Sequence, residues 1–218
     1  MSIVVEEELS SQIASASVVI QPASWELYEK LLKETEEQHL RMVYDEGTLE
    51  IMSPRYDHED VKKLLGRMIE IVAEETDADI KSFGSATYRR QSRRKGLEAD
   101  ESYYLKSEPK IRGKRRLDLQ RDPPPDLVVE VDLTSHTLDK LRVYAGLGIP
   151  EIWNWDNGKV QFLLLRRGKY EARTRSLSFP FIGVSDVQRI VDQIENGREK
   201  LIVREWRLWV RKQAAQGE

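Results

Sequence analysis

The stretch PPPDLVVEVDLTSHTLDKLRVYAGLGIPEIWNWD, residues 123–156, decides the fold and contains the feature that points to function. Its first part predicts a buried strand over residues 126–132, because Val128, Val129 and Val131 form an apolar run. Glu130 interrupts this run with a carboxylate. A carboxylate is costly to bury unless a cation, a proton or hydrogen bonds compensate it. The group that pairs with Glu130 therefore indicates whether this strand carries a functional site.

Helical and strand patterns alternate along the rest of the chain, which predicts one α/β domain with a mixed sheet. The expected elements are, in chain order, a helix after Ser24, a hairpin over 41–53, a helix over 58–77, two or three short strands within 79–106, the strand over 126–132, a helix from about Thr137 to Leu147, a hairpin over 151–165 and two C-terminal helices. We expect residues 1–20 to be a flexible lead-in, residues 21–175 to form the domain, and residues 176–218 to be a helical extension packed on that domain.

Composition excludes several classes of protein. The chain has 218 residues, a net charge of −3 and no cysteine, so disulfides, thiolate metal sites and cysteine nucleophiles are ruled out. No apolar run is long enough to span a membrane, and the acidic N-terminus lacks the features of a secretory signal. We therefore expect a cytoplasmic protein that does not enter a membrane.

Asp100, within GLEADESYYL, is the acid that best matches Glu130, because it lies in another predicted strand. Two carboxylates brought together from neighbouring strands repel each other unless a divalent cation or a shared proton lies between them. Oxygen ligands of this kind suit Mg²⁺ or Mn²⁺. Lys140, on the helix after the Glu130 strand, is placed to orient a water molecule and to stabilise negative charge on a phosphate.

Structural alternatives exist for each of these residues. Glu130 can pair with an arginine, and Lys140 can be a solvated helix residue. Asp126 is too far along the strand from Glu130 to share one ion, so we expect it to be structural. A two-carboxylate hydrolase such as a glycosidase is a weaker hypothesis, because only Tyr103 and Tyr104 lie near Asp100 in the sequence to stack on a sugar.

The chain resembles a large family of bacterial restriction-endonuclease-like domains of unknown function in the PD-(D/E)xK nuclease superfamily. The segments that carry this resemblance are DEGTLEIMSP, GLEADESYY and PPPDLVVEVDLTSHTLDKLRVYAGLGIPEIW, within residues 20–175. The resemblance implies an α/β fold with a restriction-endonuclease-like αβββαβ core and a mixed central sheet. The N-terminal helix and hairpin and the C-terminal helices are additions to that core.

The resemblance also implies roles for individual residues. Asp100 and Glu130 match the metal-binding acids, and Glu98 precedes Asp100 where it can contact the metal through water. The usual lysine position holds Asp132, which departs from the superfamily pattern, and Lys140 on the following helix matches the lysine of the related family. Glu50 and His58 match family positions that flank the site. The implied function is Mg²⁺-dependent (or Mn²⁺-dependent) hydrolysis of DNA, and the alternative is a catalytically silent domain that binds nucleic acid or a protein partner.

Two basic stretches flank Asp100 in the sequence, RRQSRRK at 89–95 and KIRGKRR at 110–116. Charge runs are usually solvated, but beside a phosphodiesterase site they favour phosphate binding. The residues that we expect to contact DNA are Arg89, Arg90, Arg93, Arg94, Lys95 and Arg115. We also expect a homodimer, because small nuclease domains that cut both strands often pair.

Overall fold

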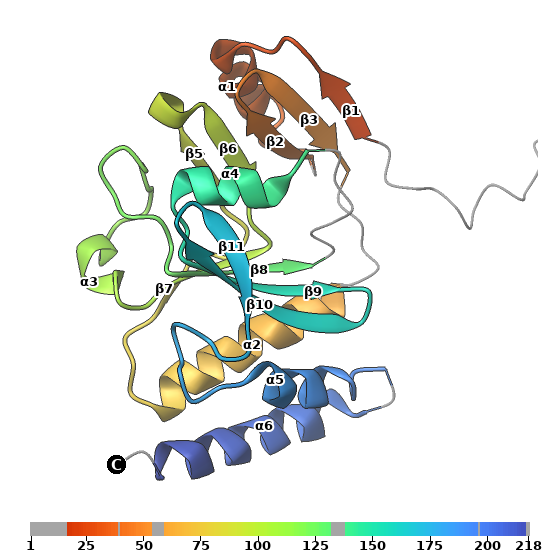
Figure 1. The fold of residues 1–218 in the computed structure, drawn as a ribbon, viewed down its shortest axis with the longest axis vertical. Coiled ribbons are helices and arrows are strands. Elements are labelled where there is room, and N and C mark those ends of the chain that lie inside the picture. The colour runs from red at the N-terminus through yellow and green to blue at the C-terminus, as the bar shows by residue number, and fades with distance from the viewer. Residues whose placement is uncertain (1–16, 39, 54–58, 132–137, 196, 217–218) are drawn as a thin grey trace, which may run out of the picture.

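The computed structural model describes residues 17–38, 40–53, 59–131, 138–195 and 197–216. Two sheets are stacked with one helix between them, and further helices cover the two outer faces (Figure 1). This arrangement confirms the predicted α/β class and the mixed sheet, and it adds a second sheet that the sequence did not predict.

The first sheet is antiparallel and contains the predicted N-terminal hairpin. Its strands are β1 (Ser17–Ile20), β2 (Arg41–Asp45), β3 (Thr48–Met52), β5 (Thr87–Arg90) and β6 (Lys95–Glu98), in the order β1-β3-β2-β6-β5. Helix α1 (Trp25–Glu34) covers its outer face, and the Ser24 side chain accepts a hydrogen bond from the Leu27 amide at 3.1 Å. This confirms Ser24 as the N-cap, because its oxygen satisfies an amide that has no partner inside the helix.

The second sheet is the mixed sheet, ordered β11-β10-β9-β8-β7-β4. Its strands are β4 (Lys81–Ser82), β7 (Glu101–Tyr104), β8 (Leu127–Val131), β9 (Glu151–Asp156), β10 (Lys159–Arg166) and β11 (Lys169–Arg173). Strands β8 and β9 are parallel, and the other neighbours are antiparallel. The predicted strand containing Glu130 is therefore a central strand, buried on both faces.

Helix α4 (Lys140–Leu147) connects β8 to β9 and lies between the two sheets (Figure 1). Parallel neighbours require such a crossover connection. Asp139 caps its start, and Gly148 ends it with a left-handed φ of 83°, as predicted. Val143 and Leu147 pack against residues of both sheets. The helix is thus held on two sides, and its first turn lies close to β8.

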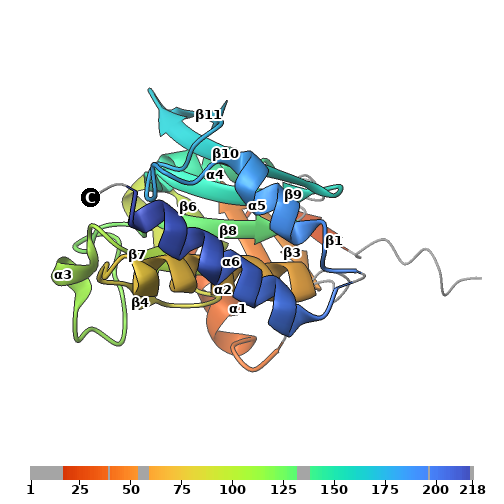
Figure 2. The same ribbon diagram turned by 90° about the horizontal axis from the view of Figure 1, so that it is seen from below.

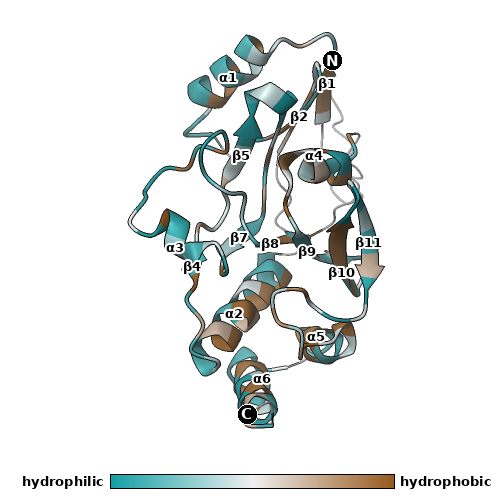
Figure 3. Cartoon of the chain, turned by 60° about the vertical axis from the view of Figure 1, so that its left-hand side comes forward, coloured by the Kyte–Doolittle hydropathy of each residue, from teal (hydrophilic) through white to brown (hydrophobic). Residues whose placement is uncertain are grey.

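Three helices form the other outer layer, namely α2 (Glu59–Glu75), α5 (Val184–Val191) and α6 (Glu199–Ala214). Helix α6 crosses beneath α2 (Figure 2), and the Trp206 indole donates a hydrogen bond to the Met68 carbonyl at 3.0 Å. Helix α2 has a hydrophobic and a hydrophilic side (Figure 3), as its apolar spacing predicted. Among the helices in the described ranges, none is long and apolar enough to cross a membrane.

Several local expectations were wrong. Residues 17–20, which we expected in the lead-in, form β1 because their backbone pairs with β3. Asp100 is not within a strand but in a bend between β6 and β7, where the chain passes from the first sheet to the second. The sequence analysis also missed β11 and the short helix α3 (Glu108–Ile111).

Candidate active site

Glu130 is completely buried in β8, and its partners are both on α4. The Lys140 ammonium forms an ion pair with Oε2, and the Tyr144 hydroxyl donates a hydrogen bond to Oε1. Lys140 is itself only 3% exposed. Residues four apart lie on one face of a helix, so the first two turns of α4 present both donors to the same carboxylate. The protein thus supplies a cation and a hydroxyl as partners for the buried acid.

Asp100 lies next to Glu130 at the end of the β7–β8 ladder. Glu101 pairs with Val129, so the residue before Glu101 lies beside the residue after Val129. Asp100 Oδ2 accepts a hydrogen bond from the Val131 amide at 2.8 Å, and Oδ1 forms an ion pair with Arg41 of β2. The two sheets therefore meet at Asp100, because Arg41 reaches it from the first sheet.

Glu98 and Arg41 form the more open side of this cluster. The Arg41 Nε atom lies 4.0 Å from the Glu98 carboxylate, whose side chain is 26% exposed. Asp100 is 7% exposed and Glu130 is inaccessible. Glu98 is therefore the most exposed of the three acids.

Burial and neighbouring charges together raise the pKa of two of these carboxyl groups and lower the pKa of the third. Burial raises the pKa of Glu130, and although Lys140 opposes this, the Asp100 charge adds to it, so the pKa lies above its usual value. Burial also raises the pKa of Asp100, but Arg41 and Lys140 outweigh burial and bring it below its usual value. The pKa of Glu98 is raised, mainly by burial. Two adjacent acids with pKa values shifted apart are typical of a functional site.

The chemistry of these side chains fits a hard divalent cation. Carboxylates, amide oxygens and water are the ligands that Mg²⁺ and Mn²⁺ prefer. Asp100 and Glu130 supply carboxylates, and beside them the buried amide oxygen of Asn154 has no hydrogen-bond partner. Within the part of the chain that the structure describes, no three His, Asp or Glu side chains are grouped to hold an ion by themselves. A bound ion would therefore keep water ligands, as Mg²⁺ usually does.

Glu50, which we expected to flank the site, is buried at the entry to α4. Its Oε2 accepts a hydrogen bond from the Leu138 amide at 2.9 Å. It thus ties β3 of the first sheet to the residues immediately before Lys140. His58 and Asp132 lie outside the described residues.

Two of the basic residues expected to contact DNA are engaged inside the protein. Lys95 is buried in an ion pair with Asp45, and the Arg90 side chain donates to the Leu119 carbonyl at 2.8 Å. These contacts leave the Lys95 ammonium enclosed and hold Arg90 against the protein. Neither residue is exposed as a free phosphate ligand in this structure.

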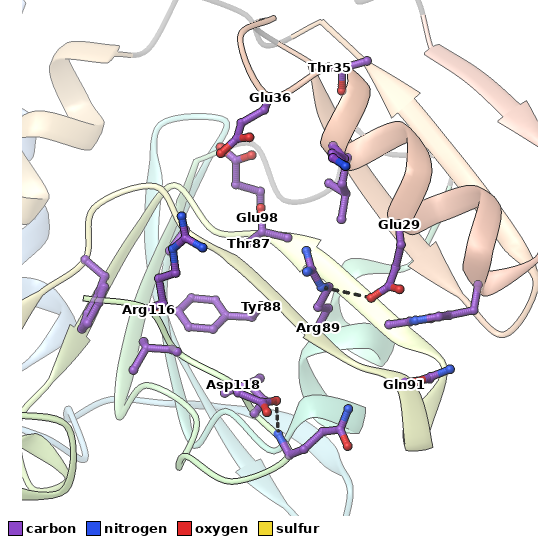
Figure 4. A pocket seen from close by; sticks show the side chains of 18 of the residues that line it. Glu29, Thr35, Glu36, Thr87, Tyr88, Arg89, Gln91, Glu98, Arg116 and Asp118 are labelled. Carbon is purple, nitrogen blue, oxygen red and sulfur yellow. Dashed lines mark hydrogen bonds and ion pairs between the residues drawn. The ribbon is translucent and has the colours of Figure 1, made fainter. Parts of the chain in front are cut away.

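The other basic residues remain at the surface. Arg93 and Arg94 are exposed in the turn between β5 and β6. Arg89 and Arg115 line a groove of about 940 Å³ between α1, β5 and residues 115–120 (Figure 4). Arg116, which the sequence analysis did not select, lines the same groove. The groove is also lined by four acidic residues, namely Glu29, Glu36, Glu98 and Asp118.

Glu98 connects this groove to the acid cluster, because it lines the groove and also lies beside Arg41. Figure 4 shows Glu98 and Arg116 at the same cavity, with Arg89 paired to Glu29 at 3.6 Å. The groove is thus an open surface that adjoins the least buried of the three acids.

A family model described as "Putative restriction endonuclease", Uma2, matches residues 25–187. The chain belongs to the Uma2 family. A comparison with curated proteins found no match. The match covers both sheets from β2 to β11 together with Asp100, Glu130 and Lys140, so the predicted restriction-endonuclease-like fold is confirmed for this Uma2 protein.

Sequence reasoning missed three residues of the site in this Uma2 protein, namely Arg41, Tyr144 and Asn154. Tyr144 lies four residues after Lys140, and this helical spacing was a usable signal. Arg41 and Asn154 gave none, since their places depend on how the sheets assemble. Tyr103 and Tyr104 are buried and provide no sugar-stacking surface, which removes the support for a glycosidase.

Asp126 accepts hydrogen bonds from the Leu105 and Ser107 amides, both at 2.8 Å. The Ser107 hydroxyl donates a third hydrogen bond to Asp126 at 3.0 Å. These contacts give Asp126 a structural role at the start of β8 and account for the carboxylate without an ion.

Proposed function

We propose that this protein is a Mg²⁺-dependent or Mn²⁺-dependent endonuclease that hydrolyses DNA phosphodiester bonds. The observation that carries the proposal is the juxtaposition of Asp100 and Glu130 at the β7–β8 ladder end, with Lys140 on Glu130. Membership of a family whose description reads "Putative restriction endonuclease" supports the same chemistry.

Asp100 and Glu130 would hold the ion, and Glu98, which lies beside the same Arg41 as Asp100, would act through water. When bound, a divalent ion supplies positive charge that stabilises the transition state of phosphodiester hydrolysis and activates water. Lys140 and Arg41 form ion pairs with these two carboxylates. The Lys140 ammonium would stabilise negative charge on the phosphate or orient the attacking water.

The groove supports DNA as the substrate. Arg89, Arg115 and Arg116 line it together with four acidic residues, and one of these acids, Glu98, also lies beside Arg41 of the acid cluster. Lysine and arginine contacts to phosphates supply most of the sequence-independent affinity for DNA. A strand that follows this groove would bring one of its phosphates towards Asp100.

A catalytically silent domain that binds nucleic acid or a protein partner is the second candidate. The observation that favours it is that both acids already have protein cations as partners. A domain that had lost its ion would keep such internal pairs for stability and would retain the groove. It would bind its partner equally well with and without EDTA.

A plasmid-nicking assay separates the two candidates. The wild type with Mg²⁺ or Mn²⁺ should nick supercoiled plasmid, and EDTA should abolish nicking. Asp100→Asn and Glu130→Gln should be inactive, because each keeps the side-chain shape but loses the charge that holds the ion. Glu171→Gln, which changes an exposed acid on β11, serves as the matched control and should nick like the wild type.

Equal nicking by all variants would contradict the proposed site. No nicking by any of them, combined with DNA binding in EDTA, would favour the silent domain.

A further inference from the structure

The side-chain oxygen of Asn154 is a buried acceptor without a donor. Asn154 lies in β9, is 2% exposed, and its Oδ1 atom has no hydrogen-bond partner. Leaving a buried polar atom without a hydrogen bond is destabilising, so such an atom calls for an explanation. The other atoms of this kind in the described ranges belong to Trp25, Tyr28 and Glu59, on α1 and α2. Only Asn154 has this property next to the acid cluster.

Strand register places Asn154 beside Glu130. The two residues are paired in the parallel β8–β9 ladder. Paired residues of neighbouring strands point to the same face of the sheet, and the strands are about 4.8 Å apart. That face is the one covered by α4, because Glu130 itself contacts Lys140 and Tyr144 of that helix. Val128 and Ile152, two residues before Glu130 and Asn154, also belong to the same hydrophobic cluster as Val143 of α4.

Asp100, immediately before β7, therefore forms a row of oxygen-bearing side chains with Glu130 of β8 and Asn154 of β9. Asp100 lies on the β7 side of Glu130, and Asn154 lies on the β9 side. Lys140 and Tyr144 occupy the two oxygens of Glu130. The amide oxygen of Asn154 receives neither of these donors.

We infer that Asn154 is a third oxygen donor of the cation site. The inference rests on the proposed function, since it names a further residue of the same site. Amide carbonyl oxygens, like carboxylates, suit Mg²⁺ and Mn²⁺. A bound ion would supply the partner that the amide oxygen does not find among the described protein groups. Ion binding would thus explain why a buried amide oxygen without a hydrogen-bond partner occupies this position, although it does not stabilise the fold.

A purely structural role for Asn154 makes the opposite prediction for stability. If the side chain held the fold together, its removal would lower the melting temperature of the ion-free protein and leave ion affinity unchanged. If it serves the ion, its replacement by leucine should leave the ion-free melting temperature equal or higher, because an unsatisfied polar atom is removed from the core. The same change should weaken ion binding.

The test is Mn²⁺ binding by calorimetry together with thermal unfolding of the full chain in EDTA. Asn154→Leu should bind Mn²⁺ about 10- to 100-fold more weakly than the wild type, the range typical for loss of a supporting group at a metal site. Asn154→Asp should bind Mn²⁺ more tightly, and its ion-free melting temperature should fall because it adds a third carboxylate to the row.

Glu151→Gln is the matched control on the same strand. The Glu151 carboxylate accepts hydrogen bonds from the Leu177 and Ser178 amides at 2.9 and 2.8 Å, so it is fully engaged in the fold. Its replacement should lower the ion-free melting temperature and leave Mn²⁺ affinity unchanged, which is the signature of a structural residue.

The inference is overturned if Asn154→Leu binds Mn²⁺ as tightly as the wild type, or if it behaves like Glu151→Gln. Should the leucine variant fail to fold, the aspartate variant decides, since unchanged or weaker Mn²⁺ binding by Asn154→Asp would also overturn it. A wild type that binds no Mn²⁺ would overturn the proposed function together with this inference. The two failures are therefore distinguished by the wild-type titration.

Discussion

Replacement of Lys140 by methionine tests how the buried acid is compensated. The substitution removes the only cation in direct contact with Glu130 among the described residues and leaves its carboxylate buried beside Asp100. Removing one partner of a buried ion pair costs about 3–5 kcal/mol, because the remaining charge is uncompensated. For a chain of this length, that loss lowers the melting temperature by about 6–20 °C. Mn²⁺ should restore part of it by replacing the missing positive charge.

The assay is thermal unfolding of Lys140→Met and wild type at pH 7.5, first in EDTA and then in Mn²⁺. Arg67→Met is the control, because Arg67 and Glu199 are 51% and 71% exposed and form their ion pair at the surface. Loss of such a pair costs at most about 1 kcal/mol. The expectation is wrong if Lys140→Met loses no more stability than Arg67→Met.

The destabilisation by Lys140→Met should also depend on pH. Burial raises the pKa of Glu130, and Lys140 holds it down, so the substitution raises the pKa further. A protonated Glu130 needs no counter-charge. The loss should therefore be largest above the pKa of Glu130 in the folded variant and should shrink as the pH falls through that value. A loss that stays constant between neutral and acid pH would show that the Lys140 charge is not its cause.

Two further predictions concern Asp100 and the groove. The pKa of Asp100 is lowered in the folded state, so its contribution to stability is present above the usual aspartate pKa of about 3.9 and is lost as the pH falls through its folded-state value. Urea unfolding at several pH values should show that the wild type has a higher free energy of unfolding than Asp100→Asn near neutral pH and that this difference shrinks in acid. A difference in the free energy of unfolding that does not change with pH would contradict this. Replacing Arg115 and Arg116 by alanine should weaken DNA binding in EDTA and reduce the slope of log K against log salt by about two, as measured by fluorescence anisotropy. An unchanged slope would show that the groove does not contact phosphates.

Local patterns in the sequence were sufficient for most elements. Ser24 and Gly148 mark helix ends because their roles depend only on neighbouring backbone. The apolar spacing of α2 and the turn at Asn157 and Gly158 are local in the same sense. The pairing of β1 with β3 and the split into two sheets depend on contacts between distant segments, which periodicity does not report.

Some residues of the candidate site likewise gave a local signal in the sequence, and others depend on contacts between distant segments. Glu130 was recognisable because a carboxylate interrupts an apolar strand. Asp100 and Lys140 followed from their predicted positions on a strand and on the next helix, and the family resemblance implied the same two residues. The contact between Arg41 and Asp100 was not predictable, since it joins residues 59 positions apart through the meeting of two sheets. Asn154 was missed because it reads as an ordinary strand residue until the β8–β9 register is known.

The most direct test of the account is a crystal structure of the protein with Mn²⁺, in which anomalous scattering locates the ion. The anomalous peak should lie about 2.1 Å from carboxylate oxygens of both Asp100 and Glu130, with the Lys140 ammonium displaced from Glu130. A Mn²⁺ ion bound elsewhere would contradict the proposed site. So would the absence of an ion at these two acids in crystals of a protein preparation that cleaves DNA.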